Sequence, residues 1–451
     1  MQLVLARPPR RNSADAGLSV PPLGLAYIAA MARSLGHSVE IIDAYATGMS
    51  WSGFEQRIQE LQPEVLGFSA MTPVADVVAR AIRLCRPHAG KIVLGGPHPT
   101  AVGDAVFTEM PGLDAAVIGE GEPVIGPLLD WWTAGSPGDP PPGVRAPNRA
   151  FTAASPMSPS DLPRPARDLL PNDAYRYLFA TRRGFATMIS SRGCPFRCSF
   201  CDKSVGGSKW RARSARDVVD EMAELKAEFG VGFINFYDDN FTISRRRVMD
   251  ICDEIIRRGL DIEWKCEGRV DSVDPELLGR MRAAGCRVVA YGVESANPET
   301  LALLRKDITV PQAISAFAQT KAAGLRSLAY MILGAPGEDH AAVEASIQFC
   351  RDIEADYVQF STLSAMPGTP LFSHPRSLNS NVNNPLDADV DRNTLTDMDG
   401  EELGKLVRAA WLGFYLRPRP MARLLRDAVA SGSIDEVWRM GRALGRWHSA
   451  A

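Results

Sequence analysis

Cys194-Pro195-Phe196-Arg197-Cys198-Ser199-Phe200-Cys201 directly follows the strand-like run Phe185–Ser190 and the turn Ser191-Arg192-Gly193. Three cysteines thus lie within eight residues. Iron–sulfur clusters prefer thiolate ligands, and one loop can surround a cubane cluster only when its cysteines are this close together. Three ligands for four irons leave one iron open to a substrate or cofactor. The stretch therefore predicts a redox cluster with one free coordination site.

The main alternative for this loop is a structural zinc site. A structural zinc ion takes four closed ligands, usually with a second Cys or His pair farther along the chain. No such pair follows Cys201. The other cysteines stand alone in apolar or helical stretches, which predicts buried thiols rather than disulfides or a second cluster. These isolated residues are Cys85, Cys252, Cys266, Cys286 and Cys350.

The CxxxCxxC spacing, with Phe200 before the last cysteine, resembles the signature of the radical S-adenosylmethionine (SAM) family. The resemblance implies a [4Fe–4S] cluster ligated by Cys194, Cys198 and Cys201, whose open iron chelates the amino and carboxylate groups of SAM. It also implies that the reduced cluster cleaves SAM to methionine and a 5′-deoxyadenosyl radical, with Phe200 near the adenine.

The composition is that of a globular protein with more than one domain, because the chain has 451 residues, 45% of them hydrophobic and 23% charged. A net charge of −3 predicts neither a nucleic-acid nor a membrane partner. No apolar run has the length of a bilayer span, and Met1-Gln2-Leu3-Val4 leads into a strand rather than a signal peptide. We therefore expect a cytoplasmic protein.

Residues 1–135 alternate short apolar strands with amphipathic helices. Such a pattern indicates a parallel sheet covered on both faces, a doubly wound Rossmann-like α/β domain. Its ligand crevice would lie beyond the carboxyl ends of the strands, where the loops are rich in Gly, Pro and small polar residues. The expected strands are Leu3–Ala6, Ser38–Asp43, Val65–Ser69, Lys91–Gly95 and Ala115–Ile118.

Three stretches of this half resemble the cobalamin-binding domain found in front of many radical SAM domains: Pro21-Pro22-Leu23-Gly24-Leu25-Ala26, Leu94-Gly95-Gly96-Pro97-His98 and Gly119-Glu120-Gly121-Glu122. The DxHxxG sequence that supplies a histidine to cobalt in other cobalamin proteins is absent, and many radical SAM relatives hold cobalamin without it. His98 is the candidate substitute, although a histidine in a Gly-Pro turn is more often a loop hydrogen-bonding group. The resemblance implies cobalamin contacts from Ser69, Thr72, Gly95, Gly96, His98, Gly119 and Glu120.

Residues 136–180 are rich in Pro, Gly, Ser and Ala and predict a linker. Between residues 181 and 375 the strand–helix alternation returns, and six units fit a partial (β/α)6 TIM-like barrel, the fold of the resembled family. In barrels the chemistry collects at the carboxyl ends of the strands. For residues 376–451 we expect a helical cap over the barrel mouth. The expected barrel strands are Phe185–Ser190, Val231–Tyr237, Ile262–Val270, Arg287–Tyr291, Ser327–Leu333 and Tyr357–Leu363.

Polar groups follow several of these strands. Asp238-Asp239-Asn240 comes after the second strand, where the family usually places a motif that bonds the amino group of SAM, and a carboxylate suits that ammonium. Arg269, after the third, can pair with the SAM carboxylate as a planar fork. The resemblance further implies that Glu294 and Ser295 contact the ribose or the methionine end, and that Leu333 enters a Gly-rich turn against the adenine. Helix capping is the alternative role of strand-end Asp and Asn residues.

The leading functional hypothesis is cobalamin-dependent methylation of an unactivated carbon in a small molecule. One SAM would methylate cobalamin, and a second would yield the radical that abstracts hydrogen before the substrate radical takes the methyl group. An external electron donor of the flavodoxin or ferredoxin type is implied. The alternative is a dehydratase or deoxygenase, a cyclase or a ring-rearranging enzyme that moves no methyl group and has a front domain without cobalamin.

Two further alternatives fit the sequence less well. A methylthiotransferase would need additional cluster cysteines in the front domain, where only Cys85 occurs. A non-enzymatic sensor would not need the polar groups at the strand ends.

Overall fold

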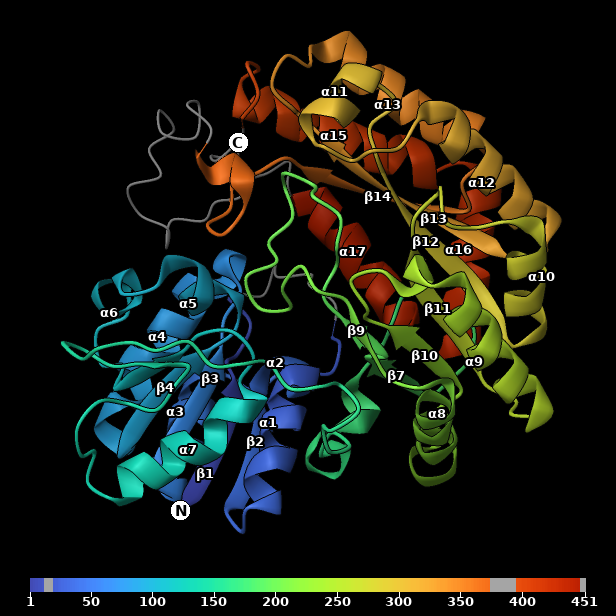
Figure 1. The fold of residues 1–451 in the computed structure, drawn as a ribbon. Coiled ribbons are helices and arrows are strands. Elements are labelled where there is room, and N and C mark those ends of the chain that lie inside the picture. Colours follow the sequence, from blue (N-terminus) through green and yellow to red (C-terminus); the bar gives the residue numbers. More distant parts are fainter. Residues whose placement is uncertain (12–18, 374–394, 447–451) are drawn as a thin grey trace.

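Two mainly parallel sheets follow each other along the chain. The computed structural model describes residues 1–11, 19–373 and 395–446. The front sheet has the strand order β2-β1-β3-β4-β5-β6, and the second sheet has the order β14-β13-β12-β11-β10-β7 (Figure 1). The expected fold class, a doubly wound domain followed by a partial barrel and a helical region, is confirmed.

Helices cover both faces of the front sheet (Figure 1). Its core strands pair in parallel, as their continuous apolar sequences predict. The strands are β1 (Gln2–Arg7), β2 (Ser38–Asp43), β3 (Val65–Ser69), β4 (Lys91–Gly95), β5 (Ala115–Val117) and β6 (Val144–Arg145). The helices are α1 (Leu23–Ser34), α2 (Ala44–Thr47), α3 (Trp51–Leu61), α4 (Ala75–Cys85), α5 (Pro97–Val102), α6 (Ala105–Glu109) and α7 (Glu122–Thr133).

Strand β6 and helix α7 were not expected from the sequence. Strand β6 lies in the predicted linker and pairs antiparallel with β5. Helix α7 begins inside the stretch that was expected to be a loop, at Glu122, with Pro123 in its first turn. A proline lacks the amide hydrogen that a first helical turn cannot use, so this Glu-Pro pair is a good helix start. The start of α7 places Glu122 at the edge of the ligand crevice.

The second sheet is curved and open, with β7 and β14 as its two edges, and its helices follow the outer face (Figure 1). All neighbouring strands are parallel, as a partial barrel requires. The strands are β7 (Phe185–Met188), β10 (Phe233–Phe236), β11 (Glu263–Gly268), β12 (Cys286–Glu294), β13 (Arg326–Leu333) and β14 (Tyr357–Thr362). The helices are α8 (Ala215–Phe229), α9 (Arg245–Arg257), α10 (Pro275–Ala283), α11 (Pro298–Leu303), α12 (Val310–Ala322) and α13 (His340–Asp352).

The carboxy-terminal helices are α15 (Gly400–Tyr415), α16 (Pro418–Ser431) and α17 (Ile434–Arg446). Residues 376–394 of the predicted cap lie outside the described residues. Helix α15 runs along β14, where the Tyr415 hydroxyl donates to the Val358 carbonyl at 2.8 Å. Asp427 of α16 accepts from Arg326 and Tyr357, which begin β13 and β14. Helix α16 therefore lies at the amino ends of the strands and not over the barrel mouth, while a cap formed by the rest of this region stays a prediction.

The segment between the sheets is built into the core. Tyr175, Tyr177, Leu178 and Phe179 are buried, and the Tyr175 hydroxyl donates to the Asp43 carboxylate of the front sheet at 2.9 Å. One continuous apolar cluster runs from front-sheet side chains through this segment into the barrel. Within the three described ranges, none of the helices combines the length and apolarity that crossing a bilayer requires.

Candidate active site

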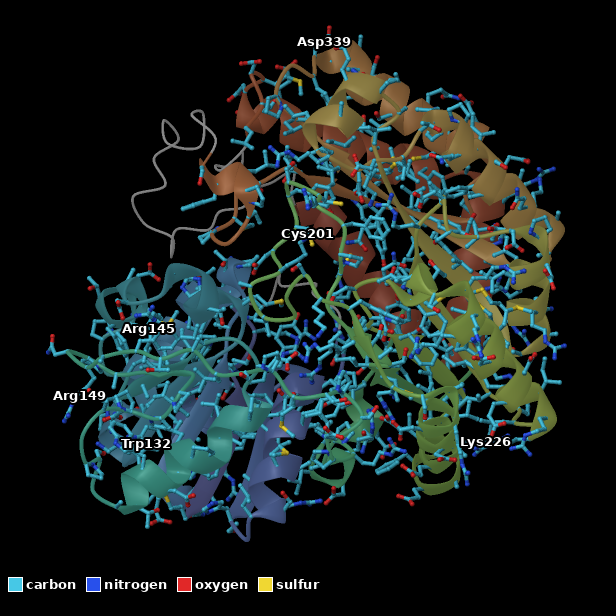
Figure 2. The ribbon with its side chains drawn as sticks, in the orientation of Figure 1. Trp132, Arg145, Arg149, Cys201, Lys226 and Asp339 are labelled. Carbon is cyan, nitrogen blue, oxygen red and sulfur yellow. The ribbon has the colours of Figure 1, made fainter. Side chains whose placement is uncertain are left out.

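Two short paired strands hold the ends of the cysteine loop together, and we call this pair, β8 (Ser191–Arg192) and β9 (Arg211–Ala212), the neck of the loop. Strand β8 pairs antiparallel with β9, so residues 193–210 form a closed loop between them. The Cys194 amide donates to the Gly207 carbonyl at 3.2 Å across this loop. All three cysteines are half-buried. Figure 2 shows Cys201 on this loop, between the two sheets.

The donor set suits a cubane cluster. Each thiolate of such a cluster binds a different iron, so the three sulfurs need not converge on one point. Among the residues in the described ranges, no three His, Cys, Asp or Glu side chains gather around a single-ion site. Burial raises the pKa of Cys194 and raises the pKa of Cys201 to about 11. Cluster assembly must therefore release protons from these thiols.

The Asp238-Asp239-Asn240 stretch divides into three roles. Asp238 is buried and accepts three hydrogen bonds at 2.6 Å, from the Ser190 amide and the Ser190 and Ser191 hydroxyls, so its carboxylate supports the neck of the loop. Asp239 accepts from the Gly193 amide at 2.9 Å, and burial raises its pKa. Asn240 caps the turn after β10, and its buried Nδ2 has no hydrogen-bond partner among the described residues.

Arg269 is buried under the cysteine loop. Its guanidinium makes a two-pronged pair with Asp271 at 2.9 Å and donates to the carbonyls of Lys306 and Asp307. It also lies 3.8 Å from the centre of the Phe196 ring in the cysteine loop. The planar fork that the sequence suggested for the SAM carboxylate is thus already paired with Asp271.

Glu294 ends β12 in a left-handed backbone conformation, with φ near 69°. Such a conformation is uncommon for a residue other than glycine and often marks a functional site. Its carboxylate accepts from Lys306 at 2.6 Å, and the Lys306 ammonium lies 5.8 Å from the centre of the Phe200 ring. Residues 305 and 307 also have positive φ angles. Sequence reasoning missed Lys306, because its turn belongs to no recognised motif.

Ser295 and Leu333 are fully buried behind this group. The Ser295 hydroxyl donates to Glu338 at 3.2 Å, and Glu338 also accepts from the amides of Gly334 and Ala335 at 3.0 Å. Glu338 therefore fixes the turn that follows Leu333. The structure places Arg269 against Phe196 of the cysteine loop and brings Glu294 near Phe200 of the same loop through Lys306. Asn240 lies in the turn after β10, and Ser295 belongs to the buried group around Glu338.

A cavity of about 360 Å³ lies between the crevice of the front sheet and the cysteine loop. Glycine backbone without side chains lines part of this cavity. A Cβ atom added at Gly24 or Gly119 would have no other atom within 4 Å. Gly96 has φ near 99°, and a side-chain carbon there would come within 2.8 Å of Ser69 and the Ala70 carbonyl. The front wall includes Ser69, Gly95, Gly96, Gly119 and Glu120, and the barrel wall includes Arg192, Asp202, Gly206, Tyr237 and Asp239.

Two predicted cobalamin residues, Thr72 and His98, do not line this cavity. The His98 ring is completely buried, with Nδ1 3.2 Å from the Thr72 hydroxyl and Nε2 2.9 Å from the Glu109 carboxylate. Both ring nitrogens are therefore engaged within the front domain. His98 therefore has the geometry of a loop hydrogen-bonding group, while the glycine-lined part of the crevice leaves its backbone open to the cavity.

Comparisons with known proteins match both halves. Family models match residues 11–128 as a B12 binding domain and residues 188–350 as the radical SAM superfamily. The uncharacterized methyltransferase PH0819 of Pyrococcus horikoshii is 34% identical, and the match covers 94% of each chain. The anaerobic magnesium-protoporphyrin IX monomethyl ester cyclase of Cereibacter sphaeroides is 30% identical over 83% of this chain, but the match covers only 64% of the cyclase.

The fold comparison agrees with these matches. The solved structure of the cobalamin-dependent SAM radical enzyme OxsB, with aqua-cobalamin and SAM bound, has a TM-score of 0.74 at 17% identity, over 97% of this chain and 71% of OxsB. A cysteine loop on a partial barrel, set against the crevice of a doubly wound sheet, defines a radical SAM enzyme with a B12-binding-type front domain. The chain belongs to this family, whose cofactors are a [4Fe–4S] cluster, SAM and cobalamin. The roles of individual side chains stay predictions.

Proposed function

We propose that the protein is a cobalamin-dependent methyltransferase that methylates an unactivated carbon of a small molecule. The observation that carries the proposal is the single cavity whose walls come from both the front-domain crevice and the cysteine loop. The relative that matches along 94% of both chains is named a methyltransferase, whereas the cyclase extends well beyond the matched region. Chemistry without methyl transfer is the weaker alternative.

When bound, the cluster and SAM supply a radical that removes a hydrogen atom, and cobalamin supplies the methyl group. The chain's own residues enclose and orient these groups. Part of the cavity wall is apolar and includes Leu25, Ile28 and Ile189. An apolar wall excludes water and so protects reactive species from side reactions. The unpaired Asn240 Nδ2 after β10 and the Glu294–Lys306 pair offer hydrogen-bonding groups for SAM.

We further propose a cytoplasmic enzyme that receives electrons from a flavodoxin-like or ferredoxin-like donor. All eight cysteines are free thiols, which suits a reducing compartment. The half-buried cysteines leave the cluster loop within reach of an external donor.

Labelled SAM tests the methyl transfer. We expect that reduced, cobalamin-loaded protein, incubated with CD3-labelled SAM and a small-molecule extract, forms a product that carries the CD3 group, as read by untargeted mass spectrometry. A reaction product without the label, formed together with stoichiometric 5′-deoxyadenosine, would contradict methyl transfer and favour the cyclase or dehydratase class.

A substitution at Gly24 tests the cofactor cavity. Gly24 lies in the first turn of α1, faces the cavity and has free space around it. We expect Gly24→Leu to retain the cluster and SAM cleavage but to lose at least about 90% of the hydroxocobalamin that survives gel filtration with wild type, a tenfold change in affinity or more. The reason is that the new side chain occupies the cavity.

Gly279→Leu is the matched control. Gly279 is also an exposed helical glycine, in α10, with no atom within 4 Å of an added side-chain carbon, and it does not line the cavity. Both substitutions replace a helical glycine by leucine, a better helix former. Equal hydroxocobalamin retention by the two variants would show that cobalamin does not bind in this cavity.

A further inference from the structure

Two carboxylates of the front domain reach across to the barrel. Arg192 donates to Glu122 at 2.6 and 3.2 Å, and Arg211 makes a two-pronged pair with Glu120, with Nη1 at 3.1 Å from the carboxylate. Arg192 also lies 3.5 Å from Glu120. The acid side chains are 2% and 6% exposed, and the arginine side chains are 13% and 14% exposed. We call these four residues the interdomain clamp.

The two arginines stand at the neck of the cysteine loop. Arg192 in β8 pairs directly with Arg211 in β9, so together they mark the first and last residues around the loop. Arg192 is two positions before Cys194. Arg211 also donates to the carbonyl of Gly206 inside the loop at 3.3 Å. The two arginines thus belong to the backbone at both ends of the loop that carries the cysteines.

The neck has little room to adjust by itself. Gly193 has φ near 81°, and a side-chain carbon there would lie 2.4 Å from the Lys209 carbonyl. The clamp joins this tight neck to residues 119–122, which also line the cavity. One short segment thus both lines the cavity and bonds the two strands that close the cysteine loop.

The charges of the clamp balance, with two carboxylates against two guanidinium groups. Removal of one partner from a buried pair leaves an uncompensated charge, which is much more costly than the loss of a surface ion pair. Arg211 donates hydrogen bonds to both carboxylate oxygens of Glu120. Glu120 would therefore contact a cofactor in the cavity through the rest of its side chain or its backbone.

We propose that Glu120 and Glu122 are positioning residues for the cluster loop: the front domain sets the placement of the three cysteines through Arg192 and Arg211, and a ligand in the cavity tightens that placement. The inference rests on the cluster of the proposed function but not on methyl transfer itself. It gives the front domain a second task besides holding a cofactor.

The test is the rate at which an iron chelator removes the cluster from anaerobic holo-protein, followed by visible absorbance with and without hydroxocobalamin. We expect wild type to lose the cluster slowly and hydroxocobalamin to slow the loss further. Glu122→Gln should lose the cluster about tenfold faster, with no effect of hydroxocobalamin and with a changed EPR spectrum of the reduced cluster. Glu122→Asp, which keeps the charge, should fall between the two, and it replaces Glu122→Gln if that variant does not fold.

Glu109→Gln is the control, because Glu109 is a front-domain acid that bonds His98 instead of a loop arginine. Wild-type loss rates and a wild-type hydroxocobalamin effect in Glu122→Gln would overturn the inference, and so would an equal acceleration in Glu109→Gln. Wild type that retains no hydroxocobalamin would contradict the proposed function and the effect of the cavity ligand. A faster loss in Glu122→Gln alone would still support the clamp.

Discussion

Cys198→Ala will abolish reductive SAM cleavage. Cys198 stands between the other two ligands of a loop closed by β8 and β9, and the chain places no further cysteine in that loop. A [4Fe–4S] cluster held by only three thiolates needs all of them, because its fourth iron binds the cofactor instead of a cysteine. We expect iron and sulfide contents near zero after reconstitution, no visible cluster absorbance and no 5′-deoxyadenosine by chromatography. Cys194→Ala and Cys201→Ala should behave in the same way.

The matched control for these variants is Cys85→Ala. Cys85 is fully buried in α4 of the front domain, and its thiol packs among apolar side chains. Its removal costs packing but leaves the cysteine loop intact, so we expect normal iron content and normal SAM cleavage. SAM cleavage by Cys198→Ala at the wild-type rate would overturn the assignment of the loop as the cluster site.

Glu221→Ala will destabilise the fold more than any other single carboxylate change on α8. Glu221 is buried between two arginines: Arg167 donates to one oxygen at 2.8 Å and Arg213 donates to the other. The same arginines bond the carbonyls of Thr187 and Ile189 beneath the cysteine loop. Breaking such a buried group by removal of one partner costs about 3–5 kcal/mol. We expect a large fall in the urea midpoint of the anaerobic holo-protein.

Glu224→Ala on the same helix is the control. Glu224 pairs with Arg164 at 2.9 Å, but its side chain is 44% exposed. An exposed pair contributes less than about 1 kcal/mol, so the urea midpoint should hardly move. A midpoint for Glu221→Ala equal to that of Glu224→Ala would contradict the role of the buried group.

The Glu221 group also predicts a pH dependence. Burial alone would raise the pKa of Glu221, but Arg167 and Arg213 outweigh it and hold the pKa below the ordinary value of 4.5. A lowered folded pKa means that the stabilisation is complete above the unfolded value and is lost as the pH falls through the lower folded value. Glu221→Ala should therefore lose this part of the acid sensitivity of unfolding.

Hydrophobic periodicity predicted the strands of both sheets, and the resemblance to the radical SAM family predicted that the second set forms a partial barrel. Each expected strand of both sheets is present within a few residues, because continuous apolar runs such as Val65–Ser69 have only one way to be buried between helices. The β8–β9 neck escaped prediction, since two-residue strands carry no periodic signal. Helix α16 was misplaced because the contact of Asp427 with Tyr357 joins residues far apart in sequence.

The site was predicted by residue type better than by role. Asp238 and Arg269 lie where the sequence suggested, yet their polar atoms are bonded to other protein groups. Lys306 and the arginines of the interdomain clamp gave no sequence signal, because their partners Glu294, Glu120 and Glu122 are reached only through the fold. Long-range ion pairs of this kind are invisible to local patterns.

The apolar core that runs unbroken from the front sheet through Tyr175, Tyr177 and Phe179 into the barrel limits how the molecule can move. Swinging the halves apart would expose those rings to water, at a cost that grows with the area uncovered. This core therefore opposes a hinge motion that separates the two halves. We therefore expect a cofactor to enter and leave through the opening of the cavity itself.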